Sequence, residues 1–87
     1  MNYTFIDVRE PHEYAAGHVK GAVNIPPFEL MRGPKVLKDI PKDTPIVLYC
    51  HSGSRSNVAM NIMRTIGYTN LTNGINRGQV EARYLRT

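Results

Sequence analysis

Cysteine is almost missing from this chain, since Cys50 is the single example among 87 residues. An internal disulfide and a metal site built from several cysteines are therefore excluded. Long apolar runs are missing too, because no stretch approaches the roughly 20 residues that span a bilayer. Repeats, low-complexity segments and blocks of like charge are absent as well. The 11 Lys and Arg residues exceed the 7 Asp and Glu residues by four, which gives a net charge of +4. Because the basic residues are scattered, this charge favours small anionic partners over nucleic acid or a membrane surface.

The length and composition fit one ordinary globular domain. A chain of this size is too short for two independent cores, so residues 1–87 are predicted to form a single domain, and a monomer is expected. Hydrophobic residues make up 41% and charged residues 21%, as in soluble globular proteins. No basic segment followed by an apolar run opens the sequence, which predicts a cytoplasmic protein. A periplasmic protein whose signal peptide has been removed is the alternative.

Four short strands are predicted. Each is rich in β-branched or aromatic residues and is bounded by Pro, Gly or polar residues. They are residues 4–8, 22–25, 46–49 and 68–71. The third is a continuous apolar run, which is typical of strands buried on both faces of a parallel sheet. Asn73-Gly74 is predicted to form a turn after the last strand.

Helical segments are predicted between and after these strands. Glu10-Pro11 can open a helical turn, and Gly33-Pro34 divides residues 28–40 into two short pieces. A longer helix follows residue 56 and is closed by Gly67. Its predicted core-facing stripe is Val58, Ala59, Ile62, Met63 and Ile66. The predicted C-terminal helix has Val80, Tyr84 and Leu85 on one face. Alternating strands and helices predict a small α/β domain with a largely parallel sheet.

The segment after the buried strand carries the candidate chemistry. Ligand sites in open parallel sheets lie beyond the carboxyl ends of the strands, where Cys50 stands. Successive backbone N–H groups in a tight loop bind anions, and the positive end of the following helix adds to their field. Gly53 permits a positive φ, and the neighbouring serines are small enough for the backbone to approach an anion. Arg55 adds a cation with a planar donor fork.

These surroundings favour the thiolate form of Cys50, which is a nucleophile at neutral pH. The alternative interpretation is that Cys50 is a small buried hydrophobic residue with no chemical role, but the polar loop that follows it favours a reactive thiolate. A thiolate needs no dedicated base. His51 is interpreted as solvent-facing, because one Cys-His pair lacks the three or four ligands of a zinc site. Neither a metal nor an organic cofactor is expected.

Two separated motifs resemble the rhodanese family. The family's active loop reads Cys, one or two variable residues, Gly, another residue, Arg, then Ser or Thr, and the matching residues are Cys50, Gly53, Arg55 and Ser56. The matching N-terminal segments are Asp7-Val8-Arg9, Glu13-Tyr14, Gly17-His18-Val19 and residues 21–26. The resemblance covers nearly the whole chain and is nearest to the short bacterial phage-shock-protein E type, whose members are thiosulfate sulfurtransferases.

The resemblance implies a rhodanese-like α/β fold, with a small parallel sheet flanked by helices on both faces. It implies that the catalytic Cys50 takes a sulfane sulfur from thiosulfate or a persulfide donor and holds it as a persulfide. The sulfur would then pass to cyanide or to a thiol acceptor, which can be a protein thiol. The implied substrate-binding residues, acting through their backbone, are His51, Ser52, Gly53, Ser54 and Arg55.

Departures from the family pattern leave the preference for thiosulfate and the rim of the site open. His51 stands where thiosulfate-using members often carry Arg or Lys, and Gly74-Ile75-Asn76 stands where a Gly-Gly pair is common. A non-catalytic sulfur-carrier or partner-docking module is a second interpretation, although such modules often lose the cysteine that this chain keeps. A cysteine phosphatase is a third, although such enzymes have five residues between Cys and Arg where this chain has four.

Charged residues outside the loop are interpreted as structural. An ion pair between Arg9 and Glu13 is predicted to order the first loop, in preference to a role for Arg9 at the anion site. Asp7 is predicted to bind backbone groups, because a carboxylate beside Cys50 would oppose thiolate formation. His12 and His18 are predicted to be structural.

Overall fold

Four parallel strands form the centre of the protein in a computed structural model that describes residues 3–85. They are β1 (Thr4–Asp7), β2 (Val23–Asn24), β3 (Ile46–Cys50) and β4 (Leu71–Asn76). Their order in the sheet is β2-β1-β3-β4, and every neighbouring pair is parallel. Parallel neighbours require crossover connections, which the helices provide.

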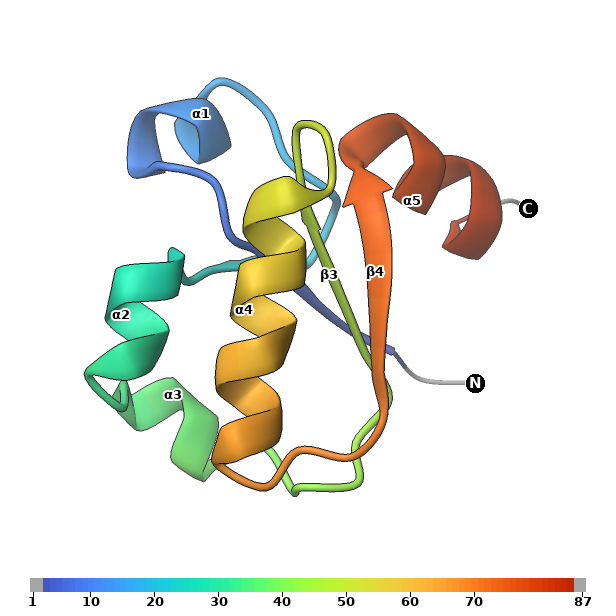
Figure 1. The fold of residues 1–87 in the computed structure, drawn as a ribbon. Coiled ribbons are helices and arrows are strands. Elements are labelled where there is room, and N and C mark those ends of the chain that lie inside the picture. The colour runs from blue at the N-terminus through green and yellow to red at the C-terminus, as the bar shows by residue number, and fades with distance from the viewer. Residues whose placement is uncertain (1–2, 86–87) are drawn as a thin grey trace.

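Helices cover both faces of this sheet (Figure 1). On one face lie α2 (Pro27–Met31), α3 (Lys35–Lys38) and α4 (Ser54–Thr65). On the other lie α1 (Pro11–Ala15) and α5 (Arg77–Tyr84). Two apolar clusters result, one holding Leu48 and Met63 and the other holding Val47 and Val80. The predicted α/β fold with helices on both faces is confirmed.

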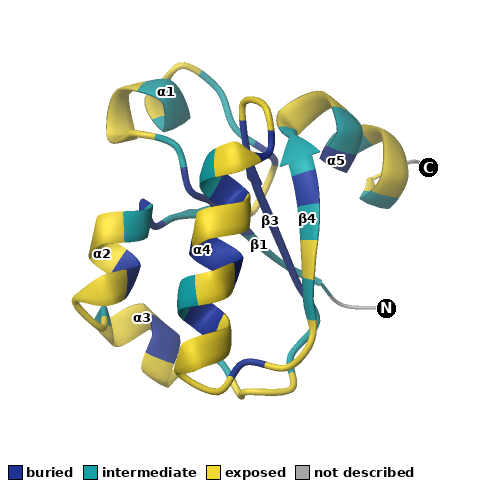
Figure 2. Ribbon diagram, viewed as in Figure 1, coloured by how far each residue is buried: buried dark blue, intermediate teal, exposed yellow. Residues whose placement is uncertain are grey.

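The central strand β3 is buried along its whole length (Figure 2). Alternate side chains of a strand point to opposite faces. Ile46, Leu48 and Cys50 accordingly join the α4 side, while Val47 and Tyr49 join the α5 side. All five are at most 1% exposed, which explains why this strand is continuously apolar.

Helix α4 begins and ends at glycines with positive φ. Gly53, its N-cap residue, has φ +95°, and Gly67, just beyond its C-cap, has φ +104°. The N–H of Gly67 donates to the Arg64 carbonyl, and the N–H of Tyr68 donates to the Met63 carbonyl. This is a Schellman motif, as expected where glycine closes a helix.

Among residues 3–85 no helix has the length and apolarity needed to cross a membrane.

The buried face of α4 differs from the predicted stripe. Its buried residues are Ser56, Ala59, Met60 and Met63. Val58 is 51% exposed and Ile66 is 41% exposed, so their assignment to the core is wrong. Ser56 turns inward toward Cys50, and residues three and four positions apart share its face. Val58, two positions away, is thereby directed outward.

The last strand lies further along the chain than predicted. Strand β4 begins at Leu71 and contains Asn73-Gly74, so the predicted strand over 68–71 and the predicted turn are both wrong. In its register with β3, Leu48 pairs with Asn73 and Tyr49 pairs with Ile75, which leaves Gly74 as a bulge. A Cβ at Gly74 would lie 2.5 Å from Val80 Cγ2 and 2.8 Å from Val47 Cγ1. This glycine is required by close packing.

Candidate active site

Cys50 lies at the carboxyl end of β3, and residues 51–53 turn the chain directly into α4. Residues 50–56 are called the Cys50 loop below. Figure 1 shows the loop at the end of the sheet where α1 lies and α5 begins. Cys50 is 1% exposed and belongs to the apolar cluster beneath α4. The predicted strand-loop-helix junction is confirmed.

Hydrogen-bond donors converge on the Cys50 sulfur. The Gly53 N–H donates to Sγ over 3.0 Å, and the Ser56 hydroxyl oxygen lies 3.5 Å from Sγ. Burial by itself raises the pKa of the Cys50 thiol. Hydrogen bonds from the Ser56 hydroxyl and from the backbone N–H groups of Ser56, Gly53 and Ser52 outweigh burial, and the pKa falls below its ordinary value of 9.0. The loop therefore favours a nucleophilic thiolate.

Arg55 does not present a free cation to the loop. Its Nη1 and Nη2 atoms donate to the Glu13 carboxylate of α1 over 2.6 and 3.1 Å. Glu13 also accepts the Glu10 N–H over 2.9 Å. The guanidinium lowers the pKa of Glu13 to about 2, mainly through its hydrogen bonds. Arg55 therefore fastens the loop to α1, with both terminal nitrogens of its guanidinium donating to Glu13.

Arg9 binds Asp7, so the predicted ion pair between Arg9 and Glu13 is wrong. Its Nη2 lies 2.7 Å from Asp7 Oδ2 and also donates to the Gly17 carbonyl. Asp7 is fully buried and accepts the Arg9 N–H and the Tyr49 hydroxyl as well. A buried carboxylate needs such hydrogen-bond partners. Arg9 can supply them because it stands two residues after Asp7 in the chain. The predicted backbone hydrogen bond to Asp7 is confirmed.

The side chains of the other predicted loop residues point away from the Cys50 sulfur into solvent. His51, Ser52 and Ser54 are exposed, and the Ser52 and Ser54 hydroxyl oxygens are 3.3 Å apart. These three polar side chains therefore lie on the exposed surface of the Cys50 loop. Within residues 3–85, no group of three or more His, Cys, Asp and Glu side chains is placed to hold a metal ion. His18 stacks on Tyr14 with ring centroids 3.6 Å apart, in keeping with a structural role.

Asn73 belongs to the site, and sequence reasoning missed it. Its Oδ1 accepts the Ser56 hydroxyl over 2.7 Å, and its Nδ2 donates to the Gly53 carbonyl over 3.0 Å. The bulge in β4 aims this side chain at the Cys50 loop. The Asn-Gly pair predicts a turn from sequence alone, so no local signal indicated this contact.

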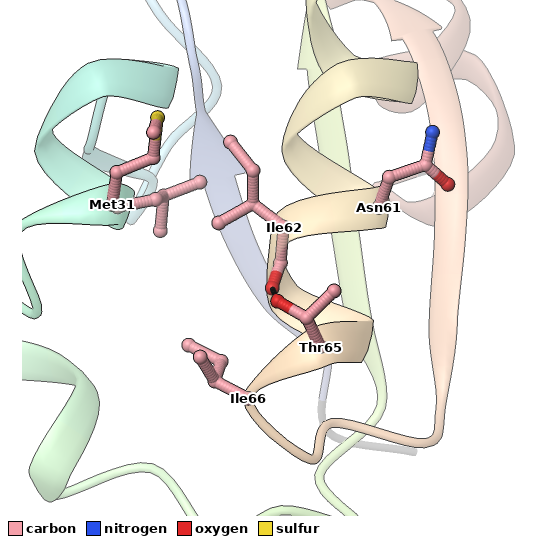
Figure 3. Close-up of a pocket in the computed structure, with 6 residues that line it drawn as sticks. Met31, Asn61, Ile62, Thr65 and Ile66 are labelled. Atoms are coloured by element: carbon pink, nitrogen blue, oxygen red, sulfur yellow. Dashed lines mark hydrogen bonds between the residues drawn. The ribbon is translucent and has the colours of Figure 1, made fainter.

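An apolar groove of about 370 Å³ lies away from the Cys50 loop, between α2 and α4. Its lining residues are Leu30, Met31, Asn61, Ile62, Thr65 and Ile66. Figure 3 shows the Met31 and Ile62 side chains extending from the two helices into this space. The residues that line the groove include no nucleophile and no buried polar group. The groove is therefore a surface feature separate from the sulfur chemistry.

Comparisons with known proteins agree with this geometry. A family profile described as "Rhodanese-like domain" matches residues 1–79. The thiosulfate sulfurtransferase PspE of Escherichia coli is 37% identical over 70 residues, which are 79% of this chain and 65% of that protein. An Allochromatium vinosum protein named sulfurtransferase is 35% identical, over 78% of this chain and 61% of its own length. The chain thus spans less than two thirds of either relative.

A solved structure described as a rhodanese with anions from E. coli has the same fold. It superposes with a TM-score of 0.79 at 32% identity, and the match covers 90% of this chain and 91% of that one. The anions named in that description belong to the E. coli protein. The likeness therefore extends across nearly all of both chains.

Proposed function

Because the chain belongs to the rhodanese family, we propose that it is a sulfurtransferase in which Cys50 accepts a sulfane sulfur and passes it on. The observation that carries this proposal is the convergence of the Gly53 N–H and the Ser56 hydroxyl on Sγ at the start of α4. Charge on sulfur is stabilised there by fixed dipoles. The same donors suit a thiolate before transfer and a persulfide after it.

The first half-reaction begins with the Cys50 thiolate. It attacks the outer sulfur of thiosulfate and forms a new S–S bond. The S–S bond of thiosulfate breaks, and its electron pair leaves with sulfite. A persulfide anion remains on Cys50, so charge and sulfur are balanced. The backbone N–H groups of the Cys50 loop are the donors available to the incoming dianion, since Glu13 occupies the Arg55 side chain.

The second half-reaction returns Cys50 to the thiolate. A nucleophilic acceptor attacks the terminal sulfur of the persulfide, the cysteine–sulfur bond breaks, and its electron pair returns to Sγ. Cyanide would leave as thiocyanate, and a thiolate would leave as a new persulfide. The exposed polar mouth formed by His51, Ser52 and Ser54 gives a small acceptor or a protein thiol access from solvent.

Intact mass spectrometry tests the covalent step. Incubation with thiosulfate should add one sulfur, about 32 Da, and dithiothreitol should remove it, as covalent catalysis requires. Cys50→Ala should show no adduct, whereas Ser52→Ala, which alters an exposed side chain of the same loop, should keep it. Cyanide added to the loaded protein should release thiocyanate in an amount equal to the adduct.

Other outcomes favour other functions. A failure to form an adduct with thiosulfate and with persulfide donors would contradict the sulfurtransferase proposal. Hydrolysis of an aryl phosphate at a comparable rate would favour a phosphatase. Adduct formation without turnover, together with a stable complex with a protein acceptor, would favour a sulfur-carrier module.

A further inference from the structure

The Ser56 hydroxyl stands between the Cys50 sulfur and Asn73. Its oxygen lies 3.5 Å from Cys50 Sγ, 2.7 Å from Asn73 Oδ1 and 3.1 Å from the Gly53 carbonyl oxygen. Ser56 is fully buried, so water does not compete for these contacts. A hydroxyl has one proton to donate. Three acceptors therefore share a single donor.

The orientation of the Asn73 amide is determined by its other contacts. Its Oδ1 accepts the Ile75 N–H over 2.9 Å, and its Nδ2 donates to the Gly53 carbonyl over 3.0 Å. A flipped amide would place a donor against the Ile75 N–H and an acceptor against a carbonyl. Asn73 therefore presents an acceptor to Ser56, and the shortest contact receives the hydroxyl proton.

We propose that Asn73 is a positioning residue that competes with the Cys50 sulfur for the single proton of the Ser56 hydroxyl. This inference concerns the same sulfur as the proposed function and rests on that function for its significance. When Cys50 is a thiol, its S–H can donate to Ser56, which donates in turn to Asn73. When Cys50 is a thiolate or a persulfide, the Ser56 hydroxyl must turn toward sulfur and give up its bond to Asn73.

Asn73 thus favours the protonated thiol over the thiolate. Without its Oδ1, the acceptors left to Ser56 are the Gly53 carbonyl and the sulfur. The charged sulfur is the stronger of these, because charge-assisted hydrogen bonds are roughly twice as strong as neutral ones. Asn73→Ala should therefore lower the pKa of Cys50. Asn73→Asp should raise that pKa, since a carboxylate is a stronger acceptor for Ser56 and adds negative charge nearby.

The charged groups already present around the loop are the same in all these variants, and only Asn73→Asp adds a carboxylate to them. Arg55 of α4 interacts with the Cys50 charge, but Glu13 of α1 binds its guanidinium. His51 is exposed on the loop itself. On α5, which follows β4, Arg77 pairs with Glu81. Their effects therefore cancel in differences between variants.

A double-mutant cycle tests the competition. The pKa of Cys50 is measured from the pH dependence of its alkylation by iodoacetamide, and the signal is unambiguous because the chain has one cysteine. The proteins are the unaltered chain, Ser56→Ala, and Asn73→Ala and Asn73→Asp in each background. With Ser56 present, Asn73→Ala should lower the pKa by about half to one unit, the scale of one net hydrogen bond. With Ser56→Ala, that shift should vanish.

The Ser56→Ala background separates competition from mere loosening of the loop. A loosened loop would shift the pKa of Cys50 in both backgrounds, whereas competition predicts that Asn73→Ala lowers this pKa only when Ser56 is present. The proposal is overturned if Asn73→Ala raises the pKa, leaves it unchanged, or shifts it equally in both Ser56 backgrounds. Should Asn73→Ala not fold, Asn73→Asp decides, because its increase must be larger with Ser56 present than in the Ser56→Ala background. Alkylation does not require sulfur transfer, so failure of the proposed function would appear separately as a missing mass adduct.

Discussion

The Arg55 guanidinium binds the Glu13 carboxylate 42 residues earlier in the chain, over 2.6 and 3.1 Å. This bidentate pair joins the first turn of α4 to α1. It directs the cation of the Cys50 loop toward a neighbouring helix, so the proposed function assigns binding of the anionic donor to the loop backbone. A side chain expected to supply a cation to the anion site therefore has a second role in holding the loop.

Glu13→Gln should reduce stability in a pH-dependent manner. The folded-state pKa of Glu13 is about 2, below the ordinary value of 4.5, so its contribution is complete above pH 4.5 and is lost as the pH falls toward 2. Because the pair is partly exposed, we expect a loss of about 1 kcal/mol at pH 7. Urea unfolding at pH 7 and pH 2.5 should show this difference shrinking in acid.

The control for that experiment is Glu81→Gln. Glu81 pairs with Arg77 one turn away on α5, and both side chains are more exposed than those of Glu13 and Arg55. Such surface pairs contribute about 0.3–0.5 kcal/mol. An equal effect for the two substitutions would contradict the structural role of the pair between α1 and α4.

Ser56→Ala should raise the pKa of Cys50. Burial opposes the thiolate, and the Ser56 hydroxyl is the strongest of the hydrogen-bond donors that overcome it. Its removal leaves only the backbone N–H groups to oppose the effect of burial, so the pKa should rise. The pH dependence of iodoacetamide alkylation measures this shift. Ser52→Ala is the matched control, because the Ser52 side chain is exposed and its hydroxyl contacts Ser54. This substitution should leave the pH profile of alkylation unchanged.

Tyr49→Phe should destabilise the fold without touching the Cys50 loop. The Tyr49 hydroxyl accepts the Val19 N–H over 2.9 Å and donates to Asp7 over 2.8 Å, and all of these groups are buried. Removing it leaves the Val19 N–H without its acceptor, at a cost of about 1–3 kcal/mol. Thermal and urea unfolding measure the loss.

Tyr84→Phe provides the comparison for that loss, because within residues 3–85 the Tyr84 hydroxyl makes no hydrogen bond and its ring packs on Tyr3 and Phe5. It should stay within about 0.5 kcal/mol of the unaltered protein, as surface substitutions usually do. Equal losses at the two tyrosines would show that the Tyr49 hydroxyl is not the cause.

Gly74→Ala should be the more damaging of two glycine substitutions near the C-terminus. Its new methyl group would meet Val80, Val47 and the Leu48 carbonyl, and overpacking of this kind costs about 1–3 kcal/mol. Gly78→Ala lies in α5, where the nearest atom is 3.6 Å away. It should increase stability by about 0.5 kcal/mol through helix propensity. A neutral Gly74→Ala would contradict the close packing at the bulge.

Elements governed by neighbouring residues were predictable. The apolar run at 46–49 could be identified as a buried strand because each of its side chains enters one of two cores. Gly67 could be placed at the end of α4 because a left-handed residue is the commonest way to close a helix. The reactive environment of Cys50 follows from the same local logic, since the donors on the peptide backbone of a tight loop come from its immediate neighbours.

Elements governed by tertiary packing could not be predicted from the sequence. The phase of α4 depends on which residue faces Cys50, and Ser56 takes that place at the expense of Val58. The register of β4 depends on contacts with β3 and α5, which turn an Asn-Gly pair from a hairpin signal into a bulge. Neither contact has a counterpart in the local pattern.

The position and the chemical type of the nucleophile are determined by adjacent residues, because a strand, a tight loop and a helix N-terminus are each formed by short-range interactions. The partners of the polar side chains, in contrast, are determined by segments far away in the sequence. Glu13 binds Arg55, and Asn73 binds Ser56, over separations of 42 and 17 residues. Such pairs form where the sheet brings distant segments together and burial leaves each polar group few alternatives. The donors to the Cys50 sulfur are thus local, whereas tertiary structure alone decides which of them is shared with Asn73 and which helix holds the loop through Arg55.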